Sequence, residues 1–95
     1  MPIVADDCTH VWHQYVVRSK NRDRLADDLK RKGIQTGIHY PYAIHQVPAF
    51  NGIQKTPVDL SVSEEAVAEI LSLPMFPEMT ELQIDYVIES VKHLV

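Results

Sequence analysis

Five histidines are the residues of this 95-residue sequence with the widest chemical repertoire, because imidazole serves both as a metal ligand and as an acid–base group. A zinc site needs three or four converging ligands. His10 and His13 would point to opposite sides of a strand, and the sequence holds no HExxH motif. The full set is His10, His13, His39, His45 and His93. Its spacing favours separate structural or surface histidines, and we predict no metal site.

His39 differs from the others by its position. It comes where a predicted short strand ends and a long loop begins, and Tyr40 and Pro41 follow it. The ends of strands are where many folds of mixed helix and strand build their sites. Position alone leaves a functional and a structural role for His39 equally open.

The remaining reactive side chains predict no catalytic residue. Cys8, the single cysteine, lies in the irregular start of the chain, and we interpret it as a free thiol without a catalytic task. The sequence has no GxSxG nucleophile elbow and no GxGxxG or Walker A loop. Neighbouring carboxylates such as Asp27 and Asp28 face different ways on a helix. The residues by themselves therefore specify no reaction.

Composition limits the class of protein. The net charge is −4, the hydrophobic fraction is 45% and the charged fraction is 23%, values close to globular averages. The negative charge argues against binding to nucleic acid or an anionic membrane. No apolar run approaches the roughly 20 residues of a membrane span, and the start has no signal-peptide pattern. We expect a soluble, cytoplasmic, single domain.

The first half of the chain predicts a strand–helix–strand unit. Residues 1–9 form an irregular, partly disordered lead-in, and 10–18, rich in Val and aromatic residues, predict a central strand. A helix is expected over 22–32, with Leu25 and Leu29 on its inner face and Gly33 after its end. The alternating residues 34–38 predict a short second strand.

The second half predicts a long loop and two helices. The loop of 39–60 carries many apolar side chains, from Tyr40 to Ile53, and should pack against a surface. Ser61 and Glu64 have the form of a capping box for a helix that continues through Ile70 and Leu71 and ends before Pro74.

The last helix has the clearest signal in the chain. Residues 73–77, with a proline near each end, fit a short edge strand or an extended crossing. Thr80 and Gln83 form a second capping box. The helix that follows has apolar positions at 84, 87, 88, 91 and 94. Together these elements predict an α+β fold, a small, mostly antiparallel sheet covered on one face by about three helices.

Three stretches carry a resemblance to a known family. They are residues 10–18 (HVWHQYVVR), 33–41 (GIQTGIHYP) and 70–80 (ILSLPMFPEMT). In order and separation they resemble the C-terminal part of the DegT/StrS family of nucleotide-sugar aminotransferases, which depend on pyridoxal phosphate and have the aspartate-aminotransferase fold. The resemblance implies that residues 10–95 form the small C-terminal domain of such an enzyme, after the lead-in of 1–9.

The resemblance also implies what the chain lacks and which residues meet the substrate. In the family, a larger N-terminal domain carries the lysine that binds pyridoxal phosphate. Lys20, Lys30, Lys32, Lys55 and Lys92 match no such motif. We therefore expect that this chain alone holds no cofactor and does not catalyse. The positions of His39 and Tyr40 lie beside the sugar in the family, which implies a substrate-binding role for both, and no role carries over to His45.

Two main interpretations remain open. The chain is a C-terminal domain or fragment of an enzyme that transfers an amino group from glutamate to a keto nucleotide-sugar, whose partner is the missing N-terminal domain or a partner subunit. Alternatively, it is a non-enzymatic module for interaction or self-association, including a homodimer. Binding of a small molecule by His39 and Tyr40 without catalysis is a third interpretation. The apolar loop and the segment of 73–77 discriminate, because a homodimer would bury them.

Overall fold

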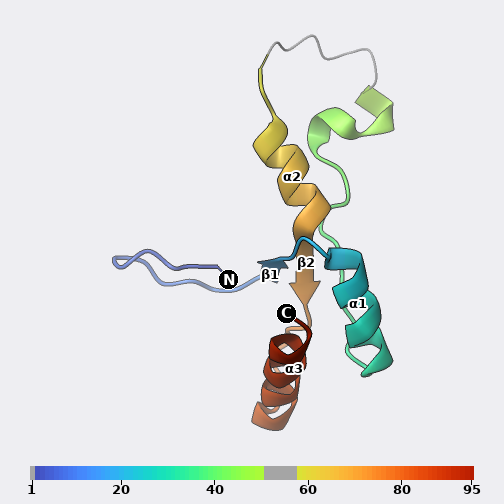
Figure 1. The fold of residues 1–95 in the computed structure, drawn as a ribbon. Helices are drawn as coiled ribbons and strands as arrows, with labels where there is room; N and C mark the ends of the chain where they lie inside the picture. Colours follow the sequence, from blue (N-terminus) through green and yellow to red (C-terminus); the bar gives the residue numbers. More distant parts are fainter. Residues whose placement is uncertain (1, 51–57) are drawn as a thin grey trace.

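The computed structural model describes residues 2–50 and 58–95 and shows an α+β fold (Figure 1). Its elements are β1 (Tyr15–Arg18), α1 (Arg22–Arg31), α2 (Ser61–Glu69), β2 (Ile70–Leu73) and α3 (Glu81–Leu94), with two single 3₁₀ turns at Ile44–Gln46 and Pro48–Phe50. The predicted fold class, helices with a small antiparallel sheet, is confirmed.

The sheet brings together the two halves of the chain. β1 and β2 run antiparallel, with Tyr15 opposite Leu73 and Arg18 opposite Ile70. On its other edge β2 makes a single bridge, in which Gly37 donates to the Ser72 carbonyl at 3.0 Å and Ser72 donates to the Gly37 carbonyl at 2.7 Å. The prediction of a strand over 34–38 is thus wrong apart from Gly37, because β2 is only four residues long and offers this edge one residue with both backbone groups free.

The hydrophobic core lies where α1 and α3 pack against the sheet. Leu25 and Leu29 of α1 are buried, as their spacing of four predicts, and Leu29 is fully inaccessible. Leu71 of β2 is 1% exposed. Burial of each such leucine stabilises the fold by about 1.5–3 kcal/mol. The buried apolar set is Val17, Leu25, Leu29, Ile34, Leu71 and Val87.

α2 leads directly into β2, and this differs from the prediction (Figure 1). The expected helix through Ile70 and Leu71 is wrong: α2 ends at Glu69, and Ile70 already has extended backbone angles. Leu71 is placed in the core by its pairing opposite Val17, whereas α2 itself contributes no buried residue. Tertiary packing here overrides the helical period of the sequence.

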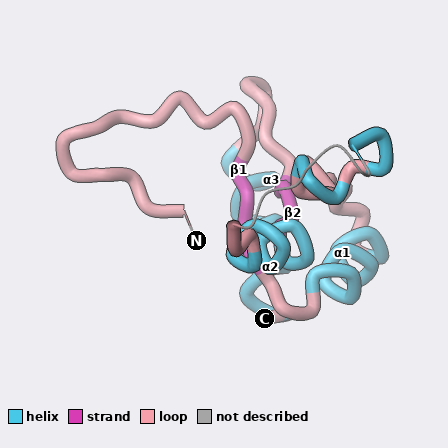
Figure 2. The backbone as a smooth tube through the Cα atoms, turned by 90° about the horizontal axis from the view of Figure 1, so that it is seen from above, coloured by secondary structure: helices cyan, strands magenta, loops and turns pink. Residues whose placement is uncertain are grey.

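The strand predicted over 10–18 is shortened to Tyr15–Arg18. Residues 2–14 form an arm that projects from the body of the molecule (Figure 2). Val11 on this arm is 95% exposed, and the rings of His10 and Trp12 stack at 4.1 Å. The prediction failed for 10–14 because the four residues of β2 pair with four residues of β1 and leave the preceding ones without a partner strand.

One of the two predicted capping boxes is confirmed. Thr80 caps α3: its hydroxyl accepts from the Gln83 amide at 3.3 Å, while the Gln83 side chain accepts from the Thr80 amide at 2.9 Å. The box predicted at Ser61 is wrong, since Leu60 is the N-cap residue. The Ser61 amide instead donates to the carboxylate of Asp59 at 2.9 Å.

The loop predicted over 39–60 is partly ordered by the two 3₁₀ turns. His45 Nε2 lies 2.9 Å from a carboxylate oxygen of Glu64, which ties the first turn to α2. Ile44 and Phe50 remain exposed. The apolar Ile53 and the loop lysine Lys55 lie outside the described residues. No helix in the described part of the chain has the length and apolar character needed to cross a membrane.

Candidate functional site

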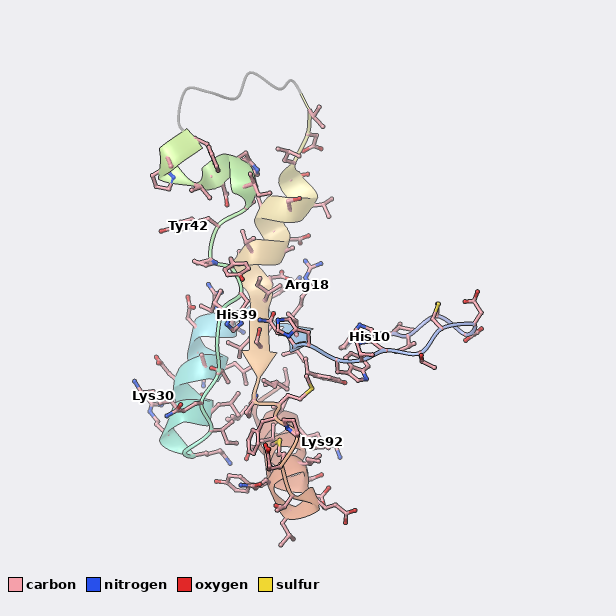
Figure 3. The ribbon with its side chains drawn as sticks, turned by 180° about the vertical axis from the view of Figure 1, so that it is seen from behind. His10, Arg18, Lys30, His39, Tyr42 and Lys92 are labelled. Atoms are coloured by element: carbon pink, nitrogen blue, oxygen red, sulfur yellow. The ribbon has the colours of Figure 1, made fainter. Side chains whose placement is uncertain are left out.

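His39 lies beside β2, where the chain leaves the bridge to that strand (Figure 3). Its Nδ1 is 2.9 Å from the hydroxyl oxygen of Ser72. The imidazole lies over the backbone of Gly37, because a Cβ added at Gly37 would come within 2.6 Å of His39 Cε1. The ring therefore has a defined place although His39 as a residue is exposed.

A cavity of about 390 Å³ opens beside the ring of His39. Its walls come from the arm before β1, from the segment after α1, and from β2 with the turn that follows it. Its polar lining is His13, Gln14, Gln35, Thr36, His39 and Ser72. Amide, hydroxyl and imidazole groups both donate and accept hydrogen bonds, and the lining from the described residues holds no carboxylate, lysine or arginine. The cavity is also lined by the apolar Leu73, Pro74 and Met75, so the lining fits an uncharged ligand that carries both hydroxyl and apolar groups.

Tyr40, the other predicted site residue, lies apart from this cavity. Its side chain is 72% exposed, and its ring meets that of His39 edge-on at 5.9 Å between centroids. Among the described residues it is not part of the cavity lining. Within the described part of the chain, Tyr40 is therefore exposed and does not line this cavity.

Of the polar residues that line the cavity, sequence reasoning singled out only His39 and missed His13 and Ser72 among the others. His13 was interpreted as a separate histidine, yet the arm carries it to the same cavity as His39. Ser72 stands in a segment that sequence periodicity assigned to the end of a helix, so its pairing with Gly37 was hidden. The available signal was the pair of stretches around 33–41 and 70–80, which resemble the same family and meet here.

A second cavity, of about 360 Å³, lies between the loop after His39 and α2. Arg22 lines it, but its guanidinium already donates to the carbonyl of Ile70 at 3.2 Å and to that of Val67 at 3.5 Å. The same guanidinium pairs with Asp23. Because these contacts secure the end of α2, Arg22 has a structural role at this cavity.

Ion pairs on the outer side of the sheet also link elements. Arg18 of β1, labelled in Figure 3, pairs with Glu69 at 2.9 Å and with Glu65 at 3.2 Å. These hydrogen bonds raise the pKa of Arg18, and the bond to Glu69 has the larger effect. The charge of Arg18 is thus fixed across the ordinary pH range. The pair fastens β1 to α2 and does not border the polar cavity.

The described lysines do not fit the requirements of a Schiff-base lysine. Such a lysine needs a desolvated or charge-tuned pocket. Lys20, Lys30, Lys32 and Lys92 are exposed, and none of them lines either cavity. Figure 3 shows where Lys30 and Lys92 lie, on α1 and α3. Within the described ranges, no three His, Cys, Asp or Glu side chains gather as they would around a metal ion.

Comparison with known proteins assigns the fold to a family. A sequence model described as the DegT/DnrJ/EryC1/StrS aminotransferase family matches residues 1–92. The crystal structure of DesV from S. venezuelae in complex with a ketimine intermediate superposes with a TM-score of 0.89 at 35% identity, covering 98% of this chain and 25% of that one.

Two curated relatives agree over nearly the whole chain. A pleiotropic regulatory protein of Geobacillus stearothermophilus is 42% identical over 95% of this chain and 24% of its own length. The dTDP-3-amino-3,6-dideoxy-alpha-D-galactopyranose transaminase of Aneurinibacillus thermoaerophilus is 38% identical over 96% of this chain and 24% of its own length. The chain thus spans about a quarter of the length of the curated relatives it matches.

Proposed function

We propose that this chain, which belongs to the DegT/DnrJ/EryC1/StrS aminotransferase family, is the C-terminal domain of a sugar aminotransferase. The intact enzyme would transfer an amino group from glutamate to a keto group on a nucleotide-linked sugar. Similarity to a named dTDP-sugar transaminase over 96% of the chain supports this function. The chain matches only 24% of that relative's length, which supports the proposal that it is one domain of a larger enzyme.

The polar cavity beside His39 is the observation that carries the proposal. Its uncharged donors and acceptors suit the hydroxyl groups of a sugar, and its volume of about 390 Å³ accommodates a hexose-sized group. We assign His39 to the sugar-binding surface, because it lines the cavity that this chain's own residues form. Tyr40, exposed next to it, would contact the substrate from the rim once the rest of the enzyme is in place.

The cofactor of the family is pyridoxal phosphate. The described residues of this chain do not fit it, since the described lysines are exposed and lie away from both cavities. We propose that the cofactor is held by the N-terminal domain, and that this chain contributes one wall of the substrate site. On this view the chain alone forms no adduct with pyridoxal phosphate that borohydride can trap.

Exposed apolar side chains indicate where the rest of the enzyme would sit. Tyr40, Tyr42, Ile44 and Phe50 follow one another along the loop, and each is exposed. Apolar patches of this kind mark protein–protein or domain interfaces. We propose that the N-terminal domain or a partner subunit covers this loop in the intact enzyme.

A direct test joins this chain to the N-terminal part of the Aneurinibacillus relative and measures amino transfer from glutamate to its keto nucleotide-sugar. We expect His39→Ala to lower kcat/KM at least about tenfold, since a group that hydrogen-bonds the substrate is lost, and Tyr40→Phe to lower it less. His93→Ala, an exposed change on α3, is the control. Unchanged kinetics in both site variants would remove His39 and Tyr40 from the site.

The second candidate function is a non-enzymatic interaction module. The exposed apolar loop favours it as well, because self-association would cover the same side chains. Sedimentation velocity of the isolated chain distinguishes the two: a stable homodimer that buries Tyr42 and Ile44 supports the module, whereas a monomer supports the enzyme domain.

A further inference from the structure

We infer that Ser72 and Gly37 are positioning residues that hold the His39 imidazole in one orientation at the polar cavity. This inference rests on the proposed role of His39 in binding substrate. It names two residues that sequence resemblance did not single out. Neither residue would act on the substrate directly, since each acts by positioning the ring of His39.

The backbone bridge between the two residues fixes the base of this arrangement. Gly37 and Ser72 exchange both backbone hydrogen bonds, at 3.0 and 2.7 Å. Their Cα atoms are therefore held opposite each other across the edge of β2. His39, two residues after Gly37, leaves this fixed point within reach of the Ser72 side chain.

The hydroxyl of Ser72 fixes one end of the ring. Ser72 is 6% exposed, so its hydroxyl oxygen is largely withdrawn from water, and its neighbour at 2.9 Å is His39 Nδ1. A buried hydroxyl without a partner costs free energy, which favours keeping this hydrogen bond. With Nδ1 engaged, Nε2 is the ring nitrogen left to meet a ligand.

The missing side chain of Gly37 makes room for the ring. A Cβ at this position would lie 2.6 Å from His39 Cε1 and 3.3 Å from both ring nitrogens. Real Cβ atoms do not approach other atoms closer than 3.0 Å, so even alanine would force the imidazole to move from its place beside Ser72. Although His39 is exposed as a residue, these two contacts restrict the orientation of its ring, which reduces the entropy that substrate binding would otherwise cost.

Nuclear magnetic resonance of the ¹⁵N-labelled 95-residue chain tests the geometry without any activity. We expect Ser72→Ala and Gly37→Ala to shift the ring nitrogen signals of His39 while those of His93 stay in place. Ser72→Thr, which keeps a hydroxyl, should restore the original signals. Ser63→Ala, a change at an exposed serine of α2, is the matched control. His39 signals that stay unchanged in both Ser72→Ala and Gly37→Ala would overturn the inference.

A double-mutant cycle in the joined enzyme tests the consequence for substrate. We expect Ser72→Ala to lower kcat/KM about three- to tenfold, because the hydrogen bond that orients the His39 ring is lost. In the His39→Ala background the same change should have no effect. Equal losses in both backgrounds would overturn the positioning role. If His39→Ala alone has no effect, the proposed function of His39 fails, while the resonance experiment still decides whether Ser72 and Gly37 hold the ring.

Discussion

Arg22 shows how one side chain can set the boundary between two elements. It stands at the first position of α1, yet its guanidinium reaches the carbonyl oxygens of Val67 near the end of α2 and of Ile70 at the start of β2. The side chain is 14% exposed. The last carbonyls of a helix lack partners within the helix. Arg22 supplies donors there and supports the change from α2 to β2.

Replacement of Arg22 should therefore destabilise the fold. We expect Arg22→Met to lower the free energy of unfolding by about 1–3 kcal/mol, because charged donors to partly buried carbonyls are lost. Arg24→Met is the matched control: Arg24 is 85% exposed and its nearest carboxylate oxygen, on Asp28, is 3.7 Å away. Urea denaturation of both variants makes the comparison. Equal stability of the two would show that the contacts of Arg22 contribute nothing.

At the scale of residues, the sequence predicted His39 as a candidate by its place at the end of a strand, and its role in binding substrate stays a prediction. His13 and Ser72 could not be found in the same way. Their membership of the cavity depends on the path of the arm and on the bridge to Gly37, which are contacts between distant parts of the chain. Local spacing carries no information about such contacts.

At the scale of elements, the start of α2 is held by a hydrogen bond to the Asp59 carboxylate rather than by the predicted capping box at Ser61. The Asp59 carboxylate accepts a hydrogen bond from the Ser61 amide, and this bond lowers the pKa of Asp59 below its ordinary value of 3.8. A carboxyl whose pKa is lower in the folded than in the unfolded state stabilises the fold when the pH is above its unfolded-state pKa. That contribution is lost as the pH falls through the lower, folded value.

The start of α2 should therefore loosen in acid. We expect the amide proton signal of Ser61 to titrate with a midpoint below pH 3.8. In Asp59→Asn this titration should vanish, because the amide oxygen still accepts the bond but carries no charge. A midpoint at or above 3.8 would contradict the hydrogen bond at this helix end.

Helices were more predictable from the sequence than strands. α1 and α3 have complete local signals: the pair Leu25 and Leu29, and the capping box of Thr80 and Gln83. β1 and β2 have four residues each, and each strand ends where its partner strand ends. The segment around Ile70 has a helical period but is drawn into the sheet by the burial of Leu71, which no local pattern reveals.

At the scale of the whole molecule, a small buried core coexists with a large exposed apolar surface. The core includes Val17, Leu29 and Leu71, whereas Ile44 on the loop is 79% exposed. A domain that is complete in itself keeps such side chains few and scattered. Their run along one loop fits the proposal that another domain completes this one.

This proposal predicts opposite behaviour in isolation and in the enzyme. Ile44→Lys should leave the unfolding free energy of the isolated chain within about 0.5 kcal/mol, since no burial is lost. In the joined enzyme the same change should lower the melting temperature and the activity, because a charge enters an apolar interface. Leu29→Lys, in the core, is the control that should unfold both. An unaffected joined enzyme would show that the loop faces water.

The pairing of β1 with β2 has a consequence for how the protein is made. The two strands pair across a long stretch of chain: Arg18 of β1 lies opposite Ile70 of β2. At a synthesis rate of about 5–20 residues per second, β1 waits on the ribosome for roughly 3–10 seconds before its partner exists. α1 can coil at once from local contacts. The unpaired Val16 and Val17 are meanwhile open to chaperones, and a chain whose synthesis ends before Ile70 has no partner strand for β1.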